Sequence, residues 1–164
     1  MKVILFGVAL TIAASLGPSQ KTDHAASIEI NGVSLRLGMT KSEVEQKFQG
    51  SQIVKSSQDG WLIGNPGSLL HFTVGRLTFA ERNWPNQSND IGEQLFGAVN
   101  SINSEGFYNC RVYTDVKTDP AATLHRVWID CGDKSVLVAR YVGASGKVYN
   151  TVDEHLGHLR NTDN

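Results

Sequence analysis

The sequence predicts an α+β fold in which two main helices pack on an antiparallel sheet stabilised by one disulfide. Three observations support this prediction: an Asn-Gly turn within residues 28–35, helix-capping and helical apolar spacing after Thr40 and Asp90, and two cysteines that face each other across a predicted hairpin. Because each helix precedes a run of strands, we also consider two tandem halves, residues 28–86 and 87–160, within a single domain at 28–160.

The first 17 residues resemble a secretory signal peptide. Lys2 precedes an apolar run from Val3 to Ala14, and small residues follow at the expected cleavage position. We therefore expect a secreted or periplasmic protein, and a polar, flexible lead-in at residues 18–27. No cysteine follows the apolar run and no segment reaches the ~20 apolar residues of a membrane helix, so neither a lipid anchor nor a membrane span is expected.

Residues 28–35 predict the first hairpin. Asn-Gly at 31–32 tolerates the positive φ angles of a tight turn, and pairing about it places Ile28 opposite Leu35 and Ile30 opposite Val33.

A short helix is predicted next. Thr40 and Glu43 form a capping box, Met39 and Val44 form a hydrophobic staple, and Gly50 is a typical stop.

Strands are then predicted at 61–63, 70–74 and 77–84, followed by a second helix. A hairpin turn at Gly75-Arg76 pairs Phe72 with Phe79 on the core face. The helix begins at Asp90, ends at Gly106, and has its apolar residues on one face, namely Ile91, Leu95, Ala98, Val99 and Ile102.

The hairpin formed by residues 107–117 and 123–131 has the best-defined register. Folding it at the centre of its turn places Cys110 opposite Cys131, within disulfide reach, and closing that loop is worth roughly 3 kcal/mol. On the reverse face the same register pairs Arg111 with Asp130, Tyr113 with Trp128, and Asp115 with Arg126.

A strand at 135–142 and a short fourth strand at 148–150 complete the predicted sheet. Thr151 and Glu154 repeat the capping-box spacing, which favours a short helical segment at 156–159 interrupted by Gly157.

Candidate chemistry is sparse. His155 and His158 have a spacing that permits a shared metal, but we favour a structural or solvent-facing role. His71 or His125 could join nearby carboxylates and serines in a hydrolase site, although no Gly-x-Ser-x-Gly elbow is present. We therefore expect no catalytic residue, metal or cofactor, and keep a small secreted hydrolase as the alternative function.

The reverse face of the cysteine hairpin is the candidate binding surface. Aromatic and arginine side chains carry much of the binding energy at protein interfaces, and here they lie among carboxylates: Arg111, Tyr113, Asp115, Arg126, Trp128 and Asp130. The alternative is that these are ordinary cross-strand pairs, or that a helix covers them. Fifteen basic against 16 acidic side chains provide no basic field, so no nucleic-acid partner is expected.

The segment from Leu35 to Val44 contains Gly38-Met39-Thr40 followed by Glu43-Val44. It resembles the opening motif of SmpA/OmlA-type domains, small lipoproteins of the β-barrel assembly machinery, and a similar plan occurs in tandem in β-lactamase inhibitor proteins. The resemblance implies a helix on an antiparallel sheet that acts through protein contacts. We therefore expect an exported, non-enzymatic module of the bacterial envelope or secretome that is assembly-factor-like or inhibitor-like and binds another envelope or secreted protein.

Overall fold

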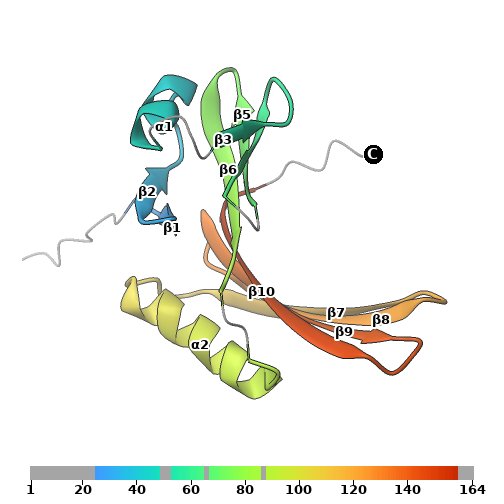
Figure 1. The fold of residues 1–164 in the computed structure, drawn as a ribbon. Coiled ribbons are helices and arrows are strands. Elements are labelled where there is room, and N and C mark those ends of the chain that lie inside the picture. The colour runs from blue at the N-terminus through green and yellow to red at the C-terminus, as the bar shows by residue number, and fades with distance from the viewer. Residues whose placement is uncertain (1–24, 49–52, 65–66, 86–87, 159–164) are drawn as a thin grey trace, which may run out of the picture.

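A computed structural model describes residues 25–48, 53–64, 67–85 and 88–158 of the 164-residue chain. The predicted signal peptide, most of the lead-in, the Gly50 helix stop and the end of the 156–159 segment lie outside the described residues. Within them, the fold is dominated by an eight-stranded antiparallel sheet with the strand order β3-β4-β5-β6-β10-β9-β8-β7 (Figure 1).

Each helix precedes four strands that are consecutive neighbours in this sheet. α1 (Lys41–Lys47) leads into β3 (Ile53–Lys55), β4 (Gly60–Ile63), β5 (Ser68–Thr73) and β6 (Arg76–Asn83). α2 (Ile91–Ser104) leads into β7 (Arg111–Thr118), β8 (Ala122–Asp130), β9 (Lys134–Gly143) and β10 (Val148–Gly157). Antiparallel pairing of β6 with β10 joins the two groups of strands.

The predicted α+β class with two main helices was wrong, because the fold is mostly β. α1 has only 7 residues and α2 has 14, whereas β9 and β10 alone have 10 each. Of the helices in the described residues, none is long and apolar enough to cross a bilayer.

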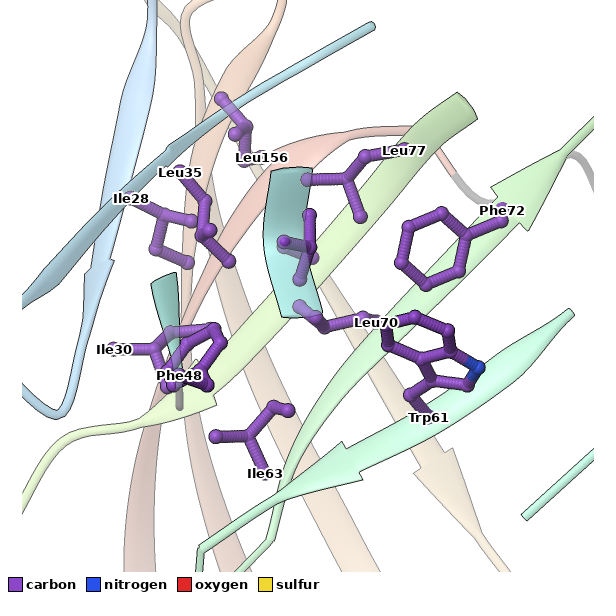
Figure 2. Close-up of a cluster of buried hydrophobic side chains, with 12 residues drawn as sticks. Ile28, Ile30, Leu35, Phe48, Trp61, Ile63, Leu70, Phe72, Leu77 and Leu156 are labelled. Atoms are coloured by element: carbon purple, nitrogen blue, oxygen red, sulfur yellow. The ribbon is translucent and has the colours of Figure 1, made fainter. Parts of the chain in front are cut away.

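Both helices lie on the same face of the sheet. α1 and the separate hairpin of β1 (Ser27–Ile30) and β2 (Val33–Arg36) cover a buried cluster on β4–β6, shown in Figure 2. α2 covers a second buried cluster, in which Ala98 and Ile102 pack with Val136, Val138 and Val152. β10 contributes Val152 to the α2 cluster and Leu156 to the α1 cluster, so the two cores share one strand.

The local predictions around the first hairpin and both helix starts are confirmed. Ile28 pairs with Leu35 and Ile30 with Val33. Thr40 and Glu43 form the complete capping box. Asp90 caps α2 by accepting a hydrogen bond from the Gly92 amide at 2.7 Å.

The predicted register of β5 and β6 was wrong. His71, not Phe72, pairs with Phe79, while Phe72 pairs with Leu77, and the register shifts between these pairs. The turn falls at Val74-Gly75, where both residues have positive φ, and Thr78 is the extra residue of a β-bulge. Phe72 and Leu77 therefore both reach the α1 cluster, and Phe79 points to the opposite face of the sheet.

The register of β7 and β8 is confirmed, together with the disulfide. Cys110 and Cys131 are bonded and their Cα atoms lie 4.3 Å apart. Arg111 pairs with Asp130, Tyr113 with Trp128, and Asp115 with Arg126.

The helical segment predicted after Thr151 was wrong, because β10 continues to Gly157. Residues 153–157 pair with β6, and residues 148–156 pair with β9. Two neighbouring strands thus satisfy the backbone of this segment, and the side chain of Glu154 points into the protein, where it cannot close a capping box.

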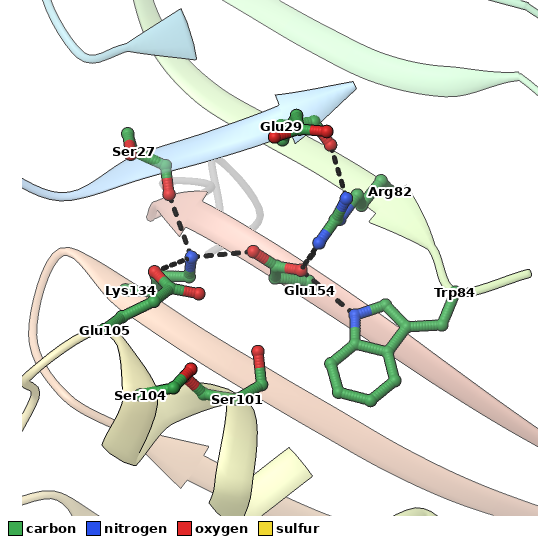
Figure 3. A network of polar contacts seen from close by, with 9 residues as sticks. All are labelled: Ser27, Glu29, Arg82, Trp84, Ser101, Ser104, Glu105, Lys134 and Glu154. Atoms are coloured by element: carbon green, nitrogen blue, oxygen red, sulfur yellow. Dashed lines mark hydrogen bonds and ion pairs between the residues drawn. The ribbon is translucent and has the colours of Figure 1, made fainter. Parts of the chain in front are cut away.

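A buried charge network lies where β6 and β10 join (Figure 3). Glu154 accepts hydrogen bonds from Arg82 Nε at 2.7 Å and Trp84 Nε1 at 3.0 Å, and Lys134 Nζ lies 2.7 Å from its other oxygen. Lys134 also contacts Glu105 at the end of α2 and donates to the Ser27 carbonyl of β1 at 2.9 Å. The network therefore links both helix-bearing halves to the central strand pair.

Glu154→Gln should destabilise the protein by about 3 kcal/mol at pH 7, because it leaves the buried Lys134 ammonium undercompensated. Burial alone would raise the pKa of Glu154, but Lys134, Arg82 and Trp84 hold that pKa below the ordinary 4.5. The contribution of Glu154 is therefore complete above pH 4.5 and is lost as pH falls through its lowered pKa.

Chemical denaturation of the unchanged protein and of Glu154→Gln at several pH values measures this difference in unfolding free energy. Glu105→Gln is the control: Glu105 also contacts Lys134 but is 32% exposed, so the loss should be about 1 kcal/mol or less. Equal losses for the two variants would contradict a special role for Glu154.

Gly157→Ala should destabilise the protein by about 3 kcal/mol, because a Cβ at this position would lie 2.2 Å from the Thr78 carbonyl oxygen and φ is +79°. Gly146 is a matched control with φ of +77° and open space around its Cβ position, so Gly146→Ala should cost about 1 kcal/mol. Urea denaturation measures the unfolding free energy of both variants. Equal losses of stability would show that the close approach of the Thr78 carbonyl does not exclude a side chain at position 157.

Candidate functional site

The face of the eight-stranded sheet opposite the two helices carries the candidate site, and we call it the open face. It contains the side chains of alternate residues along each strand, such as Phe79 and Glu81 of β6 and Asp153 and His155 of β10. Within the described parts of the chain, no helix or hairpin covers this face (Figure 1). The predicted alternative that a helix covers the Tyr113 and Trp128 pair is therefore wrong for the described residues.

Four rings form a continuous row across the open face. Tyr113 of β7 stacks on Trp128 of β8 with ring centroids 6.2 Å apart. Trp128 contacts His155 of β10 at 5.4 Å, and His155 stacks on Phe79 of β6 at 5.7 Å. The row therefore crosses from the disulfide hairpin to the α1 half of the sheet.

Ser135 explains how this row passes over β9. It pairs with Asp130 on one side and with His155 on the other, at the position where a large side chain would separate the rings. Because serine is small, Trp128 and His155 reach each other diagonally across the intervening strand.

The aromatic row borders a groove of about 540 Å³. Tyr113, Trp128, His155 and Phe79 all line it, together with Leu137 of β9. Its ionisable lining residues are Glu81, Arg126, Asp130, Asp153, His155 and His158. The groove therefore combines aromatic rings with a largely polar and charged lining.

The six residues predicted to form the binding surface lie on the open face in the predicted pairs. Arg126 donates to Asp115 through Nε at 2.7 Å and also through its terminal nitrogen, and this bond holds the pKa of Asp115 below its usual range. Arg111 and Asp130 do not form an ion pair among the contacts of the described residues; Asp130 accepts the Gly132 amide at 3.0 Å instead. Arg111 and Asp115 lie outside the groove lining.

Ionisation of the Asp153 carboxyl is disfavoured in the groove. Burial and the neighbouring Glu81 raise its pKa above 3.8, although it accepts hydrogen bonds from Asn83 and Thr151. His155 Nε2 lies 3.5 Å from Glu81 Oε2. The two side chains form an ion pair only when the histidine is protonated.

The half of the groove that β6 and β10 provide was not predicted from the sequence. Residues 149–155 alternate in the way a strand does, with Tyr149, Thr151, Asp153 and His155 on one face, but the Thr151/Glu154 cap spacing masked this pattern. Phe79 was missed because the bulge at Thr78 was not foreseen and the residue was assigned to the core face.

The hydrolase alternative receives little support from the geometry. Ser135, His155 and Glu81 occupy directly paired positions on β9, β10 and β6. However, among the described residues no hydrogen bond joins Ser135 to His155, which is the contact that would activate the serine. His71 and His125, the predicted candidates, do not line the groove.

No group of three or more His, Cys, Asp or Glu residues in the described chain is placed to hold a metal ion. His155 and His158 both line the groove without such a third ligand.

Comparison of the chain with protein-family models, with curated proteins and with solved structures found no match.

Asp153→Asn should raise the midpoint of thermal unfolding at pH 7, because it removes a carboxylate whose ionised form is disfavoured in the fold. The raised pKa means that this penalty is present above the folded pKa and vanishes as pH falls towards the ordinary 3.8. The stabilisation should therefore disappear in acid. The hydrogen bond from Arg126 lowers the pKa of Asp115, so its ionised form is favoured in the fold. Asp115→Asn should therefore lower the midpoint of thermal unfolding at pH 7. Shifts of the same sign would contradict these assignments.

Proposed function

We propose that this protein is an exported, non-enzymatic binding module of the bacterial envelope or secretome that holds a protein partner on its open face. The observation that carries the proposal is the groove on the open face, where the exposed ring of Tyr113 and the half-buried ring of Trp128 continue a row whose other two rings, His155 and Phe79, are buried. Tyr113 and Trp128 are presented from strands, so they provide contact area to a partner at a small entropic cost, which is what a binding surface requires.

The composition of the open face supports a protein partner. Tyr113 is 50% exposed and Tyr149 is 48% exposed, although both rings stack on neighbours that would hold them in place. Trp128 and Arg126 are only partly buried, and the Arg126–Asp115 pair lies beside them at the rim. Aromatic residues in the centre with charged pairs at the edge are the usual anatomy of an interface.

Export is proposed from the N-terminal pattern together with the disulfide. The Cys110–Cys131 bond fits an oxidising compartment, because cytosolic reductants remove most such bonds. The partner would then be another envelope or secreted protein, and both an assembly-factor-like and an inhibitor-like role remain compatible with this surface.

The test is site-specific photocrosslinking in cells. A photoreactive phenylalanine analogue placed at Tyr113 should give one discrete adduct, because this position faces the proposed partner. The matched control is Phe96 of α2, which is 70% exposed but lies on the helix-bearing side, so the same analogue there should give no such adduct. Adducts of equal yield from both positions would contradict binding at the open face.

Purified partner then allows the contribution of the rings to be measured. Tyr113→Ala should weaken binding by about tenfold while unfolding stability changes by less than about 1 kcal/mol. The Tyr113→Ala/Trp128→Ala pair should weaken binding further. If stability falls by several kcal/mol and binding is unchanged, the rings are part of the core and the proposal is wrong.

A further inference from the structure

The charge of the groove indicates what kind of group enters it. Three carboxylates, Glu81, Asp130 and Asp153, line the groove, against one guanidinium, that of Arg126. Arg126 is already held by Asp115 at the rim, so its charge is compensated from outside the groove lining. The two histidines add positive charge only when protonated.

Glu81 and Asp153 form the centre of this negative charge. They lie on adjacent strands of the same face, and Asp153 is partly buried. Burial, and to a lesser extent the neighbouring Glu81, raise the pKa of Asp153, so the ionised form of Asp153 is disfavoured in the free protein. The groups facing Asp153 come from three strands: Glu81 and Asn83 of β6, Tyr141 of β9, and Thr151 and His155 of β10.

The surroundings of this pair suit a long side chain. Beside the carboxylates lie the half-buried side chains of Trp128 and Leu137, and the rings of His155 and Phe79 next to them are buried. Lysine and arginine combine an aliphatic stem, which packs on such rings, with a cationic head that binds carboxylates. A small cation fits less well, because no metal-binding group is present in the described residues.

We propose that the partner inserts an arginine or lysine side chain into the groove, with its stem along Trp128 and Leu137 and its head group at Glu81 and Asp153. This inference rests on the proposed function, since it specifies the partner's chemistry at the same face. A cation bound there would offset the cost of ionising Asp153.

The test uses a defined probe and does not need the natural partner. The pentapeptide acetyl-Gly-Ser-Arg-Ser-Gly-amide is titrated into the protein, and the indole N–H signal of Trp128 is followed by NMR. A Trp128→Phe variant assigns that signal among the three tryptophans. The peptide with citrulline in place of arginine is the control, because citrulline keeps the shape and removes the charge.

The arginine peptide should give a saturable shift and bind about tenfold more tightly than the citrulline peptide. Glu81→Gln/Asp153→Asn should weaken arginine-peptide binding by about tenfold, and Glu81→Gln alone should weaken it by a smaller factor. Glu45→Gln, which removes a carboxylate of α1 that pairs with Lys55, should leave binding unchanged. Lowering the pH should weaken binding as Asp153 becomes protonated.

Equal binding of the two peptides, or unchanged binding by the double variant, would overturn the inference. Tighter binding of spermidine than of the arginine peptide would also overturn it by assigning the groove to a polyamine. If the crosslinked partner binds the double variant as well as it binds the unchanged protein, the inference fails while the proposed function stands. If the arginine peptide binds but Tyr113 yields no adduct, the proposed function fails independently.

Discussion

The antiparallel pairing of β6 with β10 is the constraint on which the rest of the structure depends. Both helix-bearing halves meet there, and Glu154 lies at the junction with almost no exposed surface. A buried carboxylate is tolerated only when cations and donors surround it, and here Lys134, Arg82 and Trp84 do so from three segments of the chain. The same strands present Glu81, Asp153 and His155 on their other face. The network therefore also holds in place the strands that carry these groove residues.

The open face is acidic and aromatic for reasons that lie in the strands themselves. One extra residue at Thr78 changes which side chains of β6 face outward, and this places Phe79 beside His155. The small Ser135 then lets the row continue to Trp128 across β9. The row of rings on the open face is thus a product of strand register, and no loop contributes to it.

Local signals predicted local structure well, and long-range pairing was harder to foresee. Asn31-Gly32, the Thr40 and Glu43 cap, and the complementary pairs of β7 and β8 involve neighbours in the chain, so their residues alone determine the geometry. Thr151 and Glu154 carry an equally good cap spacing, yet two neighbouring strands whose paired residues lie 12 to 78 positions away determine the conformation of that segment. The candidate site was correspondingly predicted on β7 and β8 and missed on β6 and β10, whose contribution depends on a bulge and on pairing between the halves.

The position of β10 in the chain affects the order in which the molecule can form. This strand supplies Val152 to one core, Leu156 to the other and Glu154 to the charge network, and it is the last strand of the described chain. Neither core is therefore complete until residue 157 has left the ribosome. A nascent chain that still lacks β10 would leave apolar side chains of both clusters exposed to water.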